Sequence, residues 1–161
     1  MVIMMDPSSI LANHIERTVT GPMWHGSSLN ELLQGVTHEQ AAAHPIAGAH
    51  SIWELVLHVT AWSDIARERL NNRSLDSVPT EIDFPPVPTA TAAAWADAQA
   101  RLTASHQGLA RAAEALSADA LAAVVPVPKP RYTVSTLLHG VIEHGTYHGG
   151  QIALLKRALG I

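Results

Sequence analysis

The sequence predicts an all-α protein, a four-helix bundle made of two helix pairs with long connections. Apolar residues make up 47% of the chain, and with one Phe and two Tyr few of them are aromatic. Ala and Leu lead the helix propensity scale, whereas aromatic residues favour strands. Long segments repeat apolar residues at spacings of three and four, and capping signals precede them. At 161 residues, a single domain spanning 1–161 is expected.

The first predicted helix starts at Asp6-Pro7, because a capping side chain followed by Pro at the first helical position favours a helix start. It should end near Gly21-Pro22, where proline stops or kinks a helix. Two short helical segments, at 29–34 and at 37–45, are expected next. Each opens with a capping box, in which Ser or Thr is followed three residues later by Glu or Gln: Ser28 and Glu31, then Thr37 and Gln40.

A further capping box, Ser51 with Glu54, predicts the second long helix, which should end near Asn71-Asn72. Its spacing of three and four predicts an inward face. That face comprises Leu55, His58, Val59, Trp62, Ile65, Ala66 and Arg69. The stretch 77–88 contains four prolines and is predicted to be the longest loop.

A third long helix is predicted from about Thr91 to Leu116, with its apolar face formed by Trp95, Leu102, Leu109 and Leu116. A short segment that opens with a cap follows this helix, and a rigid proline-rich connector, 126–132, comes next. The last helix should run from about Thr133 to Leu159 and close at Gly160. Each half of the chain thus repeats one order: a long helix, a short segment that opens with a cap, and a second long helix. This repeated order of segments predicts two helix pairs.

Charge and composition narrow the class of protein. The chain has ten basic and fourteen acidic residues. It therefore lacks the excess of positive charge with which proteins bind the phosphates of nucleic acid. The chain has no cysteine, which excludes disulfides, thiolate metal ligands and a cysteine nucleophile. No apolar run approaches the roughly 18 residues of a membrane span. The start, MVIMM, lacks the basic residues and the length of a signal peptide. We therefore expect a cytoplasmic protein with no membrane partner.

The ten histidines are an unusually large share of the chain. His144 and His148 are four apart, which places both on one helix face, a spacing that zinc-binding helices use. Both interrupt the apolar stripe of the last helix, and His58 interrupts that of the second long helix. Three inward imidazoles from two helices would leave a coordination position open, as catalytic metal sites do. The alternative from residue pattern alone is three core histidines bonded to carbonyls or carboxylates.

Other positions receive weaker predictions. His139 should face away from the pair, and His25 is expected in a surface loop. The remaining histidines are interpreted as solvated or capping: His14, His38, His44, His50 and His106. Trp53, Trp62 and Trp95 are predicted to be core residues. The adjacent Gly149 and Gly150 each cost about 1 kcal/mol relative to alanine in a helix, which predicts a close backbone approach there.

Two segments resemble a known family. The segment TLLHGVIEHGTYHGGQIALLKRALG (136–160) resembles the closing helix of the DinB-like superfamily, which includes the YfiT-like metal-dependent hydrolase and thiol transferase group. The segment SIWELVLHVTAW (51–62) resembles its second helix. The resemblance implies a homodimer and one divalent ion, nickel or zinc. Its ligand positions match His58, His144 and His148. It gives no reason to expect DNA binding.

The resemblance also implies candidate activities. The leading hypothesis is a metal-dependent enzyme that transfers a low-molecular-weight thiol, such as bacillithiol, mycothiol or glutathione, to a small electrophile. A bound metal would lower the pKa of the thiol. The alternatives are a hydrolase with a metal-activated water, or a non-enzymatic metal-binding stress-response bundle. Gln151 shares the histidine face and is predicted to touch the substrate or the ligands, whereas Glu143 should be solvated. The sequence identifies neither a catalytic residue nor the substrate.

Overall fold

The computed structural model describes residues 6–73 and 77–161, and this part of the chain forms helices and no strand. The helices are α1 (Pro7–Thr20), α2 (Leu29–Leu33), α3 (His38–Ala42), α4 (Ile52–Leu70), α5 (Thr80–Asp83), α6 (Ala92–Glu114), α7 (Ala118–Ala122) and α8 (Val134–Leu159). The all-α prediction is confirmed. None of these helices is long and apolar enough to cross a bilayer. The signal-peptide expectation concerns residues 1–5, outside the described ranges.

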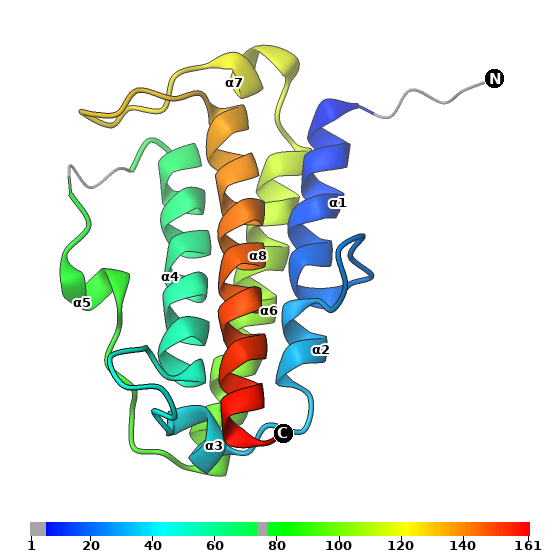
Figure 1. The fold of residues 1–161 in the computed structure, drawn as a ribbon. Helices are drawn as coiled ribbons and strands as arrows, with labels where there is room; N and C mark the ends of the chain where they lie inside the picture. Colours follow the sequence, from blue (N-terminus) through cyan, green and yellow to red (C-terminus); the bar gives the residue numbers. More distant parts are fainter. Residues whose placement is uncertain (1–5, 74–76) are drawn as a thin grey trace.

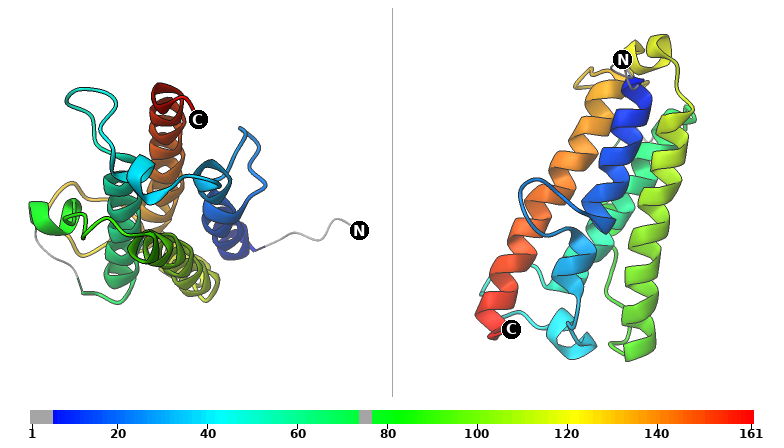
Figure 2. Two further views of the ribbon diagram at one scale, coloured as in Figure 1. Left: turned by 90° about the horizontal axis from the view of Figure 1, so that it is seen from below. Right: turned by 90° about the vertical axis from the view of Figure 1, so that its right-hand side faces the viewer.

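The four long helices lie side by side, each packed against two neighbours in the order α1, α6, α4, α8 (Figure 1). The end-on view of Figure 2 shows the same order around the axis. Following the colours along each helix, α1 and α8 run in one direction, and α4 and α6 run in the other. The short helices α2, α3 and α7 lie towards the ends of the long ones. The members of each predicted pair, α1 with α4 and α6 with α8, lie diagonally across the bundle, so each helix packs against the two helices of the other pair.

Local sequence sets the helix boundaries much as predicted. The capping boxes that begin α2, α3 and α4 are all formed, with each side chain bonded to the backbone of the other residue. Helix α8 ends where Gly160 adopts φ 75°, a left-handed conformation that glycine enters without strain. One predicted cap is wrong: Asp6 precedes α1, but its carboxylate accepts a hydrogen bond from the Ser8 hydroxyl and caps no backbone N–H.

The connection between α4 and α6 differs from the predicted loop. Because both helices point the same way, the chain must travel back along the outside of the bundle before α6 can begin (Figure 1). Part of the predicted loop, 77–88, forms the single helical turn α5, which lies against α4. This return path carries Asp83 and Phe84 across the outer side of α4, where they meet His58.

The core forms two clusters of buried apolar residues, one toward each end of the bundle. Two predictions about it are wrong. Trp62, Ile65 and Arg69 of α4 were expected to face inward but are only partly buried, because α4 turns this side toward α5 and the proline-rich connector. His106 was expected in solvent but is 1% exposed, because α6 packs between α1 and α4.

The close approach predicted at Gly149 and Gly150 occurs instead one turn earlier. A Cβ at Gly145 would lie 2.5 Å from the Thr18 methyl group of α1, a distance that real side chains do not tolerate. A Cβ at Gly149 would make only ordinary contacts with two leucine side chains, and one at Gly150 would meet nothing within 4 Å. Gly145 therefore sets how closely α1 and α8 pack.

Candidate metal centre

The three predicted histidines converge on one point between two helices. His58 projects from α4, and His144 and His148 project from successive turns of α8. The Nε2 atom of His144 lies 2.9 Å from Nε2 of His58 and 3.0 Å from Nε2 of His148. One nitrogen from each ring lies within 4.8 Å of the other two, so the group could hold a metal ion. The structure thus brings together every residue that the sequence analysis put forward as a ligand.

Burial keeps the two imidazoles of α8, His144 and His148, neutral. His58 and His148 are each 6% exposed, and His144 is partly buried. Burial, together with the neighbouring rings of His148 and His58, lowers the pKa of His144 to about 4. The pKa of His148 is also lowered, mainly by burial. At neutral pH the two rings of α8 are therefore uncharged, which is the form that binds metals.

The segment around α5 fixes the orientation of the His58 ring. Nδ1 of His58 donates a hydrogen bond to the backbone carbonyl of Asp83, with 2.6 Å between nitrogen and oxygen. The Phe84 ring stacks on the imidazole, with centroids 4.0 Å apart and an angle of 9° between the planes. The Asp83 carboxylate accepts a hydrogen bond from Nε1 of Trp62 at 2.7 Å. With its proton on Nδ1, His58 presents the lone pair of Nε2 to the other histidines.

His148 is oriented from its own helix. Its Nδ1 donates to the side-chain oxygen of Gln151 at 2.6 Å, and the Gln151 amide donates in turn to the Tyr147 hydroxyl at 3.2 Å. This bond places the imidazole proton on Nδ1 and leaves the Nε2 lone pair directed at His144. The expectation that Gln151 touches a ligand is borne out by this contact. Glu143 is exposed, as predicted.

The proton positions give a chemical test of whether these residues suit a metal. The Nε2 atoms of His58 and His148 are both acceptors, and both contact Nε2 of His144. A neutral His144 carries one ring proton, so it can donate to at most one of the two. At least one of these Nε2 acceptors therefore lies about 3 Å from His144 without receiving a hydrogen bond from it. A cation bound by the three nitrogens would satisfy that buried acceptor.

Two aspects of the centre were missed by the sequence analysis. The Asp83 carbonyl and the Phe84 ring reach His58 from 25 and 26 residues along the chain, and no local spacing marks them. Trp62 was predicted as core, but its ring lies 6.4 Å from the His58 ring and 6.0 Å from the His144 ring. Its place four residues after His58, on the same helix face, was the available signal.

The histidines predicted to lie outside the centre do so. His139 is exposed and bonds to the carbonyl of Ser135 in its own helix, and His25 is exposed in the turn after α1. His14, His44 and His50 are exposed as well, and His38 is partly buried. His106, which was predicted to be solvated but is buried, donates a hydrogen bond from Nδ1 to the carbonyl of Leu102.

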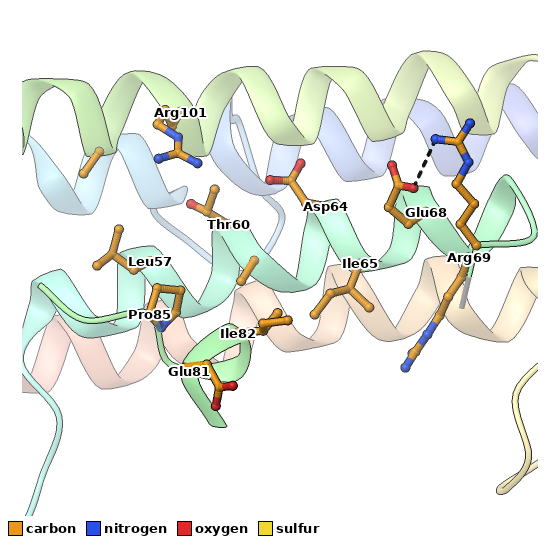
Figure 3. A pocket seen from close by; sticks show the side chains of 13 residues that line it. Leu57, Thr60, Asp64, Ile65, Glu68, Arg69, Glu81, Ile82, Pro85 and Arg101 are labelled. Atoms are coloured by element: carbon orange, nitrogen blue, oxygen red, sulfur yellow. Dashed lines mark ion pairs between the residues drawn. The ribbon is translucent and has the colours of Figure 1, made fainter. Parts of the chain in front are cut away.

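A cavity of about 650 Å³ opens beside His58 and His144. Its walls come from α4, from α8 and from the proline-rich connector, and its lining includes Trp62, Arg69 and Tyr132. A second cavity, of about 670 Å³, lies on the other side of α4 against α5 and α6 (Figure 3). Its lining contains none of the three histidines. The first cavity therefore gives a small molecule a route to His58 and His144.

A family model described as the DinB superfamily matches residues 24–152, which contain all three histidines, Asp83 and Phe84. No curated protein matches the chain.

Proposed function

The chain belongs to the DinB superfamily, and from that premise we propose that His58, His144 and His148 bind one divalent metal ion, nickel or zinc. The observation that carries the proposal is the convergence of three Nε2 atoms. At least one acceptor among them is left without a hydrogen bond, because His58 and His148 each donate from Nδ1 to another group. Two nitrogens about 2.1 Å from one ion can be at most about 4.2 Å apart. The separations of 2.9 and 3.0 Å satisfy that limit.

The activity we propose is transfer of a low-molecular-weight thiol to a small electrophile. A divalent ion held by three histidines supplies Lewis acidity, which lowers the pKa of a thiol or a water bound to it. In the transfer, sulfur forms a bond to an electron-poor carbon, and the leaving group departs with its bonding electrons. Because the chain has no cysteine, the thiol must come from a second molecule.

The residues around the centre have separate roles in this proposal. The Asp83 carbonyl and Gln151 orient the rings of His58 and His148. Trp62 covers one side of the centre and, with Leu137 and Val141, gives the adjoining cavity apolar walls that limit the access of water. The cavity itself would admit both the thiol and the electrophile.

Two alternatives use the same three histidines. With water in place of the thiol, the protein would be a metal-dependent hydrolase. In a non-enzymatic metal-binding bundle, the ion would serve only to tie α4 to α8. The cavity beside the centre favours an enzyme, because an ion with a purely structural role needs no access to small molecules.

The experiment is metal loading of chelator-treated protein, followed by metal analysis and thermal unfolding. We expect one equivalent of Ni²⁺ or Zn²⁺, and a stabilisation of about 2.7 kcal/mol at free metal one hundred times the Kd. His144→Ala and His148→Ala should each lose most of the metal and most of the stabilisation. The matched control is His139→Ala, on the same helix but exposed, which should bind as the wild type does. Wild-type protein that takes up no metal at neutral pH would overturn the proposal.

Loaded protein then separates the candidate activities. Thiol transferase activity predicts consumption of a small alkyl halide only when a thiol is present, whereas a hydrolase would release product from an ester without thiol. Both activities should disappear in His144→Ala. A protein that binds metal but shows neither activity would support the non-enzymatic alternative.

A further inference from the structure

We propose that the cavity beside the three histidines recognises a carboxylate through Arg69, so that the small substrate of this centre carries a carboxylate at one end and its reactive group at the other. The inference deepens the metal-dependent function proposed above and rests on it. Its evidence is separate from the metal proposal. It consists of the partners of Arg69, the charges that line the cavity, and the positions of Arg69 and His144 relative to the Trp62 ring.

Arg69 is held in place by neutral groups. Its Nη1 donates to the Tyr132 hydroxyl at 2.8 Å, and its guanidinium carbon lies 5.5 Å from the centroid of the Trp62 ring. Nε of Arg69 is buried and has no hydrogen-bond partner in the part of the chain that the structure describes. A guanidinium has five N–H donors, so the contacts within the protein use little of its capacity.

The other arginines at this end of α4 are paired differently. Arg67 lies 3.3 Å from the Asp64 carboxylate, and Arg73 lies 3.7 Å from that of Glu68. Among residues 6–73 and 77–161, no ion pair includes Arg69. Figure 3 shows the difference: the ion pair of Glu68 lies on one side of α4, and the Arg69 side chain extends past the other side toward α8.

The charges in the cavity favour an anion. Arg69 and Arg131 both line it, and Asp83 is the one acidic residue of the described chain in its lining. The Asp83 carboxylate already accepts from Trp62 Nε1 and lies 3.2 Å from Nδ1 of His58. The end of the cavity formed by α4 and the connector therefore carries positive charge that no carboxylate of the described chain neutralises. Arginine binds a carboxylate with two parallel hydrogen bonds, which makes it well suited to this role.

The geometry limits the size of the substrate. The Trp62 ring lies between the two ends, 5.5 Å from the Arg69 guanidinium and 6.0 Å from the His144 ring. A molecule that touches both must therefore extend along one indole ring, between apolar walls that include Leu137 and Val141. This fits a short apolar chain with a carboxylate at the far end.

The first arm of the test uses metal-free protein and two probes that differ only in charge, hexanoate and 1-hexanol, in calorimetric titrations. Charge-assisted hydrogen bonds of 1.5–3 kcal/mol correspond to about a 10- to 100-fold preference for hexanoate. Arg69→Gln should reduce that preference to less than threefold without changing the weak binding of hexanol. The matched control is Arg73→Gln, four residues later and already paired with Glu68, which should keep the preference.

A second variant separates recognition from folding. Tyr132→Phe removes the hydroxyl that holds Arg69 but keeps the charge, so it should weaken hexanoate binding severalfold while some preference remains. Arg69→Lys should also retain part of the preference. If wild-type protein binds hexanoate no better than hexanol, or if folded Arg69→Gln keeps the full preference, the proposal is wrong. Because this arm needs no metal, its result is independent of whether the metal proposal fails.

The second arm finds which molecule carries the carboxylate. Protein loaded with Co²⁺ is titrated with 6-mercaptohexanoate and 6-mercaptohexanol, and binding is followed by the sulfur-to-cobalt absorption. If the carboxylate belongs to the thiol, 6-mercaptohexanoate should bind at least tenfold more tightly than either 6-mercaptohexanol or hexanoate. If it belongs to the electrophile, hexanoate should bind equally well with and without 6-mercaptohexanol. Either result supports the Arg69 site and assigns it to one substrate.

Discussion

Nδ1 of His58 lies 2.6 Å from the backbone carbonyl oxygen of Asp83, and this bond joins the return connection to the centre of the bundle. The connection exists because α4 and α6 point the same way, so a feature of the topology supplies the group that orients a candidate metal ligand. A backbone acceptor cannot be removed by substitution at Asp83. The contact therefore has to be tested through the side chains that hold the turn in place.

Phe84→Ala is the sharpest substitution for this purpose. It removes the ring that stacks on His58 and leaves the three histidines intact. A looser turn should orient His58 less well, and partners of this kind typically contribute 10- to 100-fold to metal affinity. We expect a loss of that size in competition titrations against a chromogenic chelator. Phe84→Leu, which keeps much of the apolar contact, should lose less.

Val87→Ala is the matched control, since Val87 belongs to the same connection but packs against the core cluster near the start of α4. It should leave metal affinity within about threefold of the wild type. Equal losses in Phe84→Ala and Val87→Ala would mean that the connection acts through general stability and not through His58.

The contrast between Gly145 and Gly150 tests the packing of α1 on α8. Gly145→Ala should destabilise the fold by about 1–3 kcal/mol, because the new methyl group would overlap the Thr18 side chain unless the helices move apart. Gly150→Ala meets no atom within 4 Å and should stabilise the protein by up to about 1 kcal/mol through helix propensity. Urea unfolding of the two variants measures both values. A destabilised Gly150→Ala would contradict the interpretation that this position is open.

What the sequence could predict depended on how local the cause was. The capping boxes at Ser28, Thr37 and Ser51 act within one turn, and the helices begin where they indicate. The pair His144 and His148 follows from helix periodicity alone. His58 required the further assumption that two apolar stripes face each other.

The errors arose where neighbouring elements decide the outcome. Asp83 and Phe84 were missed because their role comes from the return path of the chain. His106 was misplaced because α6 has neighbours on two sides, although its position four residues after Leu102 and three before Leu109 already places it on the buried face. Gly145 was overlooked in favour of the more conspicuous Gly149-Gly150 pair, although only the structure shows which glycine faces α1.

The expected homodimer remains a prediction. Tyr147 and Leu154 lie seven residues apart on α8, and they are 64% and 59% exposed. Residues at that spacing lie on one side of a helix, so a second copy of the chain packed there would bury them. Light scattering should give twice the 17.2 kDa chain mass at micromolar concentration. Leu154→Glu should shift the protein toward monomer, and the exposed His139→Glu should not. A wild-type monomer would refute the prediction.

The buried ring of His106 predicts that acid destabilises the metal-free protein. Burial lowers the pKa of this ring to about 4 from the ordinary value of 6.5, so the unfolded chain binds a proton between these values that the folded chain does not. The contribution of His106 to stability is therefore complete above pH 6.5 and is lost as the pH falls toward 4. Between pH 7.5 and pH 5 this one group should cost about 2 kcal/mol.

Because His144 and His148 also have lowered pKa values, the measurement must isolate His106 by difference. His106→Leu replaces the ring with an apolar side chain that cannot take up a proton, and it should reduce the loss between pH 7.5 and pH 5 by about 2 kcal/mol in urea unfolding with chelator present. His139→Leu, in an exposed position, should leave the pH dependence unchanged. If His106→Leu shows the full wild-type loss, the acid sensitivity arises elsewhere. The next groups to examine would then be His144 and His148, whose pKa values are also lowered.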